Sequence, residues 1–162
     1  MKYCMECGTE LEGRYLEKEG MIPFCPHCQE FRFPVFNTAV SMIVLNMAED
    51  KVLLIQQNGI PDYYLVAGYI NKGESAEHAL IRELREEVGI EVSKFFFNKS
   101  EYFGKTNTLM LNFICQSTNE ILNFDTDEVD YAEWFTISEA LQKIKQGSLA
   151  QKFLEYFLLE KS

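Results

Sequence analysis

Three glutamates and two arginines lie close together in the segment RELREE, near the middle of the chain. If this segment is helical, Glu86 and Glu87 lie about 60° and 40° to either side of Glu83, so the three carboxylates share one face. Carboxylates at this spacing repel one another and destabilise a helix. A Mg²⁺ or Mn²⁺ ion would remove that repulsion, because hard cations prefer carboxylate oxygens. The alternative is a solvated helix face on which Arg82 and Arg85 are ion-pair partners.

The flanking residues indicate how a helix would present these acids. Ser75 can cap its first turn and Gly89 can end it, which predicts a helix over about Ser75 to Val88. Ala76 and Ala79 share the arc of the acids, so small side chains would leave room beside the carboxylates. The side predicted to face the core carries Leu80, Ile81, Leu84 and Val88.

The acids belong to a longer pattern that runs from Gly68 to Ile90, GYINKGESAEHALIRELREEVGI. This pattern matches all nine fixed positions of the Nudix box over twenty-three residues, and residues 35–162 resemble a complete Nudix domain. The resemblance implies an α/β fold, namely an α/β/α sandwich with a mixed sheet. It also implies Mg²⁺- or Mn²⁺-dependent hydrolysis of a nucleoside diphosphate linked to another moiety.

The Nudix resemblance assigns roles to individual residues of this chain. Arg82 would orient the acids through Glu74, and Glu83 could position the attacking water or take its proton. A metal-bound hydroxide would attack phosphorus in line with the leaving phosphate. The ligands of the catalytic ion would be the Gly68 carbonyl group, Glu83, Glu86 and Glu87.

A further acid is expected outside the box. The segment DTDEVDYAEWF, residues 125–135, resembles the stretch that supplies an additional acid in the NADH pyrophosphatases of the family. By that match, Glu128 is the candidate for an additional metal ligand or base. The alternative is that Asp125, Asp127, Glu128 and Asp130 form a solvated acidic loop.

Four of the five cysteines form two Cys-x2-Cys pairs near the N-terminus, separated by seventeen residues. This spacing is typical of a tetrahedral Zn²⁺ site, and residues 1–34 hold too few aliphatic residues to build a core without such a staple. Disulfides are disfavoured in the cytosol, and a redox motif would not need the second pair. We therefore predict a zinc ribbon over residues 1–34 with the ligands Cys4, Cys7, Cys25 and Cys28. Cys115 stands in an apolar run and is predicted to be buried.

The remaining elements are predicted from apolar patterns and turn residues. Ser138 is predicted to cap a helix that Gly147 ends, and residues 148–161 predict a closing amphipathic helix. Strands are predicted over 35–45, 52–57, 63–70, 91–103, 108–118 and 129–135, the first two as a hairpin.

A zinc ribbon directly before a Nudix domain resembles the NADH pyrophosphatase-like group. The segment KSEYFGKTNTLMLNF, residues 99–113, aligns with the substrate array of that group but lacks its prolines, so NADH specificity stays open. A nucleobase could stack on Tyr102 or Phe103, although both rings could equally be core or interface residues. Three functions follow: a pyrophosphohydrolase acting on NADH, ADP-ribose or a similar compound, a nucleoside triphosphate housecleaning pyrophosphatase, or a non-catalytic nucleotide sensor.

Charge and hydropathy set further expectations. A net charge of -10 argues against a nucleic-acid-binding surface but not against a small phosphorylated substrate, which can be held through metal ions. The sequence shows neither the apolar region of a signal peptide nor about 18 uninterrupted apolar residues. We expect a cytoplasmic protein with no membrane and no nucleic-acid partner, and the Nudix resemblance adds the expectation of a homodimer.

Overall fold

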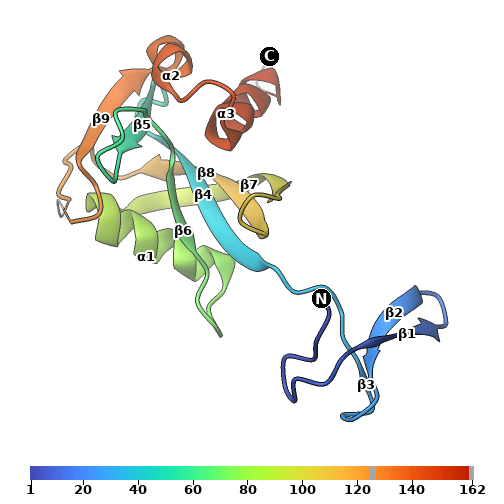
Figure 1. Cartoon of the computed structure of the whole chain (residues 1–162). Helices are drawn as coiled ribbons and strands as arrows, with labels where there is room; N and C mark the ends of the chain where they lie inside the picture. The colour runs from blue at the N-terminus through green and yellow to red at the C-terminus, as the bar shows by residue number, and fades with distance from the viewer. Residues whose placement is uncertain (125–126, 161–162) are drawn as a thin grey trace. The chain divides into compact units, whose positions relative to one another are not determined.

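The computed structural model describes residues 1–124 and 127–160 and divides the chain into two compact units, Met1–Phe36 and Asn37–Ser162 (Figure 1). The sequence placed the domain boundary between residues 34 and 35. Within the described residues, no helix has the length and apolar character that are needed to span a membrane.

The N-terminal unit is a small antiparallel sheet with the strand order β1-β2-β3. Its strands are β1 (Glu12–Leu16), β2 (Gly20–Cys25) and β3 (Glu30–Phe31). Among its apolar side chains, only Cys4, Phe24 and Cys25 are buried. This unit therefore has almost no aliphatic core, and its stability must come from another source.

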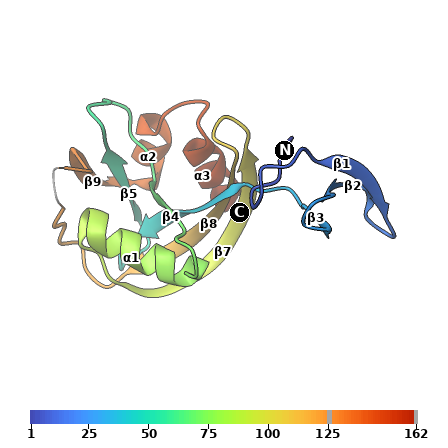
Figure 2. The ribbon, with the colours of Figure 1, turned by 60° about the horizontal axis from the view of Figure 1, so that its bottom comes forward.

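The C-terminal unit is a mixed sheet between two helical layers. The sheet has the order β7-β8-β4-β5-β9, with β6 also paired to β4. Helix α1 covers one face, and α2 and α3 cover the other (Figures 1 and 2). The elements are β4 (Asn37–Leu45), β5 (Lys51–Gln56), β6 (Val66–Tyr69), α1 (Ala76–Val88), β7 (Val92–Phe103), β8 (Thr108–Ser117), β9 (Tyr131–Thr136), α2 (Ile137–Lys143) and α3 (Leu149–Glu160). The predicted α/β/α sandwich is confirmed.

Strand β4 lies at the centre of this unit and is buried on both faces. It pairs in parallel with β8 and antiparallel with β5 and β6, which includes the predicted hairpin. Val40, Met42 and Val44 pack toward α1, whereas Ile43 and Leu45 pack toward α2 and α3. A strand covered on both faces needs apolar residues at successive positions, which explains the run AVSMIVL.

The predicted ends of helix α1 are confirmed. The Ser75 side chain accepts a hydrogen bond from the His78 N–H, and Gly89 adopts a left-handed conformation with φ of 68°. The predicted core stripe is wrong at one position, because Ile81 is 37% exposed. Ala79 is fully buried instead, so the apolar face of α1 is rotated toward the side of the acids.

The predicted ends of helix α2 are wrong. The N-cap is Thr136 rather than Ser138, because Thr136 and Glu139 form a reciprocal capping box. The helix ends at Ile144, whose extended backbone stops it before Gly147. Thr136 is also the last residue of strand β9, so the helix begins directly after the strand with no loop between them.

We expect Gly89→Ala to destabilise the C-terminal unit by about 2–4 kcal/mol. Alanine is strained in the left-handed backbone conformation of Gly89. Its Cβ atom would also lie only 2.6 Å from the Asn123 carbonyl oxygen. Gly147→Ala is the matched control, since Gly147 is also left-handed but has open space around it, and should cost about 1 kcal/mol. Urea unfolding followed by Trp134 fluorescence measures both. Equal losses would contradict the steric role of Asn123.

Candidate active site and zinc site

Helix α1 and strand β6 come into close contact at Gly68. A Cβ atom added to Gly68 would lie only 1.9 Å from the carboxyl carbon of Glu83. Any side chain at this position would displace the carboxylate, so glycine is needed to keep the Glu83 carboxyl group in this place. The structure thus brings together the Gly68 backbone and the Glu83 side chain, two groups that the Nudix resemblance places at one metal ion.

The Arg82 guanidinium connects the acids of α1 to the turn that precedes it. Its Nε and Nη2 atoms donate to the two oxygens of Glu74 at 2.8 and 2.9 Å. Its Nη1 atom donates to Glu83 Oε1 at 2.6 Å and to Glu86 Oε2 at 3.1 Å. The contact with Arg82, helped by a hydrogen bond from the Asn71 N–H, lowers the pKa of Glu74 to about 2, so Glu74 is ionised at neutral pH and pairs with the guanidinium.

Glu87 is the least satisfied of the acids. It is 8% exposed, and its Oε2 atom has no hydrogen-bond partner among the described residues. Burial raises the pKa of Glu87 to about 8, with added repulsion from Glu83, Glu128 and Glu86. Burial also raises the pKa of Glu83, despite the opposing effect of Arg82. A buried carboxylate oxygen without a partner is costly, and a bound dication would satisfy it.

Glu128 lies in the turn before β9 and is exposed. Its negative charge contributes to raising the pKa values of both Glu83 and Glu87, so the fold brings it near the acids of α1. Of the other acids in the predicted acidic loop, Asp130 accepts a hydrogen bond from the Gly59 N–H at 2.7 Å. Asp125 lies outside the described residues.

We call Glu83, Glu86, Glu87 and Glu128 the acid cluster. Its oxygen ligands and the unpartnered Glu87 atom suit Mg²⁺ or Mn²⁺. Among the described residues, only the N-terminal cysteines form a group of three or more ligand atoms that all lie within 4.8 Å of one another. The carboxylate oxygens of the acid cluster are more widely spaced than that. The Glu86 side chain is 57% exposed, and its Oε2 atom accepts a hydrogen bond from Arg82 at 3.1 Å.

The four N-terminal cysteines converge as a tetrahedral metal site requires. All their sulfur atoms lie within 4.8 Å of one another, with Cys4 Sγ and Cys28 Sγ 3.9 Å apart and Cys7 Sγ and Cys25 Sγ 3.5 Å apart. Four sulfurs at about 2.3 Å from a tetrahedral Zn²⁺ ion are separated by roughly 3.8 Å. None of the cysteines forms a disulfide. The donor set therefore fits zinc.

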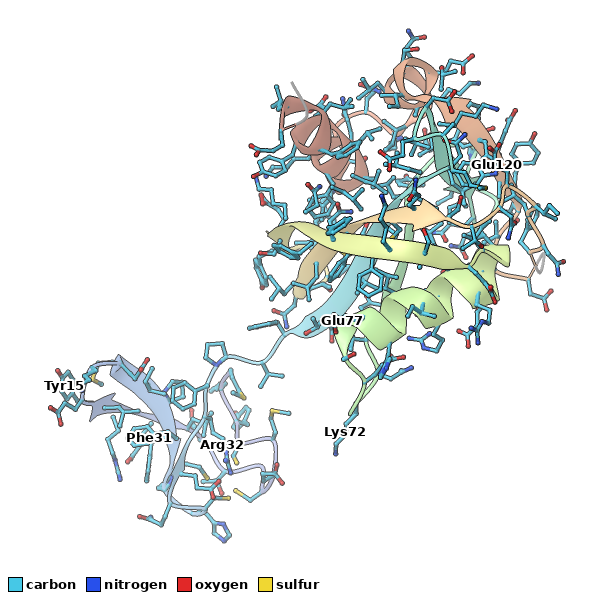
Figure 3. The ribbon with its side chains drawn as sticks, turned by 180° about the vertical axis from the view of Figure 1, so that it is seen from behind. Tyr15, Phe31, Arg32, Lys72, Glu77 and Glu120 are labelled. Atoms are coloured by element: carbon cyan, nitrogen blue, oxygen red, sulfur yellow. The ribbon has the colours of Figure 1, made fainter. Side chains whose placement is uncertain are left out.

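Arg32 is a contributor to the cysteine site that the sequence did not reveal. Arg32, labelled in Figure 3, belongs to the N-terminal unit, and its Nε atom donates to Cys4 Sγ at 3.3 Å. The contact with Arg32 is the largest of the effects that together lower the pKa of the Cys4 thiol to about 6, followed by hydrogen bonds from backbone N–H groups. A lowered pKa favours the thiolate, which is the form that binds metal. The only sequence signal for this role is a basic residue four positions after Cys28.

The two predicted base-stacking residues have different surroundings. Phe103, the last residue of β7, lines a cavity of about 620 Å³. The other walls come from β4, β6, β8, the start of α3 and the loops before β6, after β7 and before α3. Tyr102 does not line this cavity and is 58% exposed, with its hydroxyl group donating to Asn107 at 2.7 Å. Lys105 and Lys145 also line the cavity, and the sequence pattern did not indicate either residue.

Strand β6 contributes one residue to the cavity and one to the contact with the acid cluster. On β6, Ala67 lines the cavity, whereas Gly68 faces Glu83 on α1. Neighbouring residues of a strand point to opposite faces of the sheet. The cavity and the Glu83 carboxylate therefore lie on opposite faces of the sheet at β6.

Residues 35–157 match the family model described as NUDIX domain. The NAD-capped RNA hydrolase NudC of Pseudomonas aeruginosa (strain PAO1 and synonyms) is 31% identical over 99% of this chain and 57% of its own length. The NudC protein of Escherichia coli O9:H4 (strain HS) is 29% identical over 95% of this chain and 59% of its own length. The chain thus spans little more than half the length of these curated relatives.

Solved structures share the fold at lower identity. A NUDIX hydrolase from Nitrosomonas europaea superposes with a TM-score of 0.66 at 21% identity, covering 99% of this chain and 92% of that one. The NUDIX domain of Shewanella oneidensis NrtR, solved with ADP ribose, superposes with a TM-score of 0.68 at 15% identity. This superposition covers 86% of this chain and 94% of that one. These structures share the fold, and the match of the family model over residues 35–157, more than half of the chain, shows that the chain belongs to the NUDIX domain family.

Proposed function

We propose that this chain is a divalent-metal-dependent pyrophosphohydrolase that cleaves a nucleoside diphosphate derivative such as NADH or ADP-ribose. The observation that carries this proposal is the buried Glu87 carboxylate, which lacks a hydrogen-bond partner at Oε2 among the described residues. Perturbed acids beside a glycine kept bare for close approach are typical of a catalytic site rather than of a solvated helix face.

The acid cluster and the Gly68 carbonyl group would hold Mg²⁺ or Mn²⁺. The bound ion would neutralise the pyrophosphate and lower the pKa of a bound water. Glu83 would position the attacking water, since Arg82 occupies its Oε1 atom and leaves Oε2 to accept a proton. Arg82 and Glu74 would keep that carboxylate in one orientation before and after the reaction.

The cavity supports a nucleotide substrate. Its volume of about 620 Å³ lies within the range of small-molecule sites, and Phe103 offers an aromatic wall for a base. The relatives are named NAD-capped RNA hydrolases, and the Shewanella domain was solved with ADP ribose. We infer that a base enters the cavity while the pyrophosphate lies at the acid cluster.

The relatives' name also makes NAD-capped RNA a second candidate substrate. The sequence instead predicts that no nucleic acid binds, because the net charge is -10. The absence of nucleic-acid binding stays a prediction, and so do the homodimer and the cytoplasmic location. The Zn²⁺ ion at the four cysteines and the domain assignment 1–34 and 35–162 are predictions as well.

The direct test is hydrolysis in the presence of Mg²⁺. The panel consists of NADH, NAD, ADP-ribose, nucleotide sugars, nucleoside triphosphates and NAD-capped RNA. The wild type should hydrolyse at least one dinucleotide or ADP-ribose, and Glu87→Gln should lower kcat/KM by about 100-fold or more because a charged ligand is lost. Glu77→Gln, which removes an exposed acid from the same helix, should change kcat/KM by less than about 2-fold. Nucleotide binding without turnover of any substrate would favour the sensor, and turnover of triphosphates alone would favour a housecleaning enzyme.

Metal binding should also be visible without substrate. We expect millimolar Mg²⁺ to raise the Tm of the wild type by about 3 °C, because an ion that binds only the folded state stabilises it. Glu87→Gln should reduce this rise to less than about 1 °C, since the amide removes the charged ligand. Differential scanning calorimetry with and without EDTA gives both values. An equal response in the two proteins would contradict the role of Glu87 as a ligand.

The ribbon should contain one zinc ion for each chain. Metal analysis of the purified protein is expected to find about one equivalent, and a chelator that removes it should unfold residues 1–34. Cys25→Ser should lower the zinc content to below about half an equivalent, while Cys115→Ser, at a buried cysteine outside the ribbon, should leave it unchanged. Wild-type protein with four free thiols and no zinc would contradict this prediction.

A further inference from the structure

Strand β4 carries one polar side chain in the middle of an otherwise apolar run, Ser41. It is 4% exposed and lines the cavity described above. Ser41 lies on the same face of β4 as Ile43, which packs toward α3. A hydroxyl group in such a position needs hydrogen-bond partners, because an unsatisfied buried polar group is costly.

Two amide side chains that do not line the cavity, half-buried Asn98 and buried Asn112, connect α3 to Ser41. Asn98 Nδ2 donates to Asn112 Oδ1 at 2.9 Å and to the Phe153 carbonyl oxygen on α3 at 3.3 Å. Asn112 is fully buried, and its Nδ2 atom donates to Ser41 Oγ at 3.2 Å and to the Ser41 carbonyl oxygen at 3.1 Å.

The order of donors along these hydrogen bonds determines what Ser41 can offer. Asn112 uses its amide hydrogens on Ser41, so the Ser41 oxygen acts as an acceptor in this contact. A hydroxyl group has one hydrogen to donate besides its lone pairs. Because Asn112 donates to the Ser41 oxygen, the hydrogen of the Ser41 hydroxyl group is left available to a group inside the cavity.

We propose that Ser41 is a specificity-determining residue whose hydroxyl group donates a hydrogen bond to the base of the bound nucleotide. The acceptor is a carbonyl oxygen or ring nitrogen on that base, and the apolar walls from Phe103 and Met110 contact its ring. This inference rests on the proposed function, since it places the base of the substrate in the cavity. Bases that lack an acceptor at this position are bound more weakly.

The test measures binding rather than turnover, so that it stands apart from the catalytic step. The probes are methylene-bridged analogues of NAD and of ADP-ribose, whose pyrophosphate cannot be hydrolysed, titrated into the full chain by calorimetry. Ser41→Ala should raise Kd for at least one analogue by about 3- to 10-fold, and Ser41→Thr, which keeps the hydroxyl group, should stay within about 2-fold of the wild type. For a methylene-bridged analogue with a phenyl ring in place of each base, Ser41→Ala should leave Kd unchanged.

Ser117→Ala is the matched control. Ser117 is also a buried serine, but it does not line the cavity and its hydroxyl has no partner among the described residues. This variant should bind both analogues like the wild type. Unchanged Kd values for Ser41→Ala, with hydrolysis by the wild type intact, would overturn the role of Ser41 and leave the proposed function standing. If the wild type binds neither analogue and hydrolyses nothing, both proposals fail.

Discussion

The close approach between Gly68 on β6 and the Glu83 carboxyl group on α1 is the constraint on which the candidate site of the C-terminal unit depends. A space too small for one methyl group separates the strand from the acid. Helix α1 can approach so closely because its first turns pack through Ala79 and Leu80, both fully buried. Packing in the core therefore sets the place of the carboxylate, and Arg82 sets its direction. The polar site is built on an apolar contact.

Much of this site was predictable from the sequence, because it is local. Helical geometry alone places Glu83, Glu86 and Glu87 on one arc, and the caps at Ser75 and Gly89 follow from side-chain chemistry. The rotation of the helix was not predictable from its own residues. Whether an alanine or an isoleucine faces the sheet depends on how close strand β6 comes, which is a tertiary property.

Residues contributed by distant segments were the hardest to predict. The hydrogen bonds that lead to Ser41 join three strands and α3, and Arg32 reaches Cys4 across twenty-eight positions. Tyr102 and Phe103 are adjacent and chemically alike, yet only Phe103 lines the cavity. Successive residues of a strand face opposite ways, so sequence proximity does not tell which of two neighbours reaches a site. The wrong cap of α2 has a related cause, since Thr136 belongs to a strand and a helix at once.

The short length of strand β6 limits which insertions and deletions the sequence can accept during evolution. The strand is only four residues long, and Ala67 and Gly68 serve opposite faces of the sheet. The pleat of this single strand thus separates the cavity, where we propose that the base binds, from the acid cluster, where we propose that the pyrophosphate binds. Deleting or inserting one residue in it would exchange the two faces and put a methyl group against Glu83. Loops on either side can vary in length, but the frame of β6 cannot shift by one residue without loss of both sites.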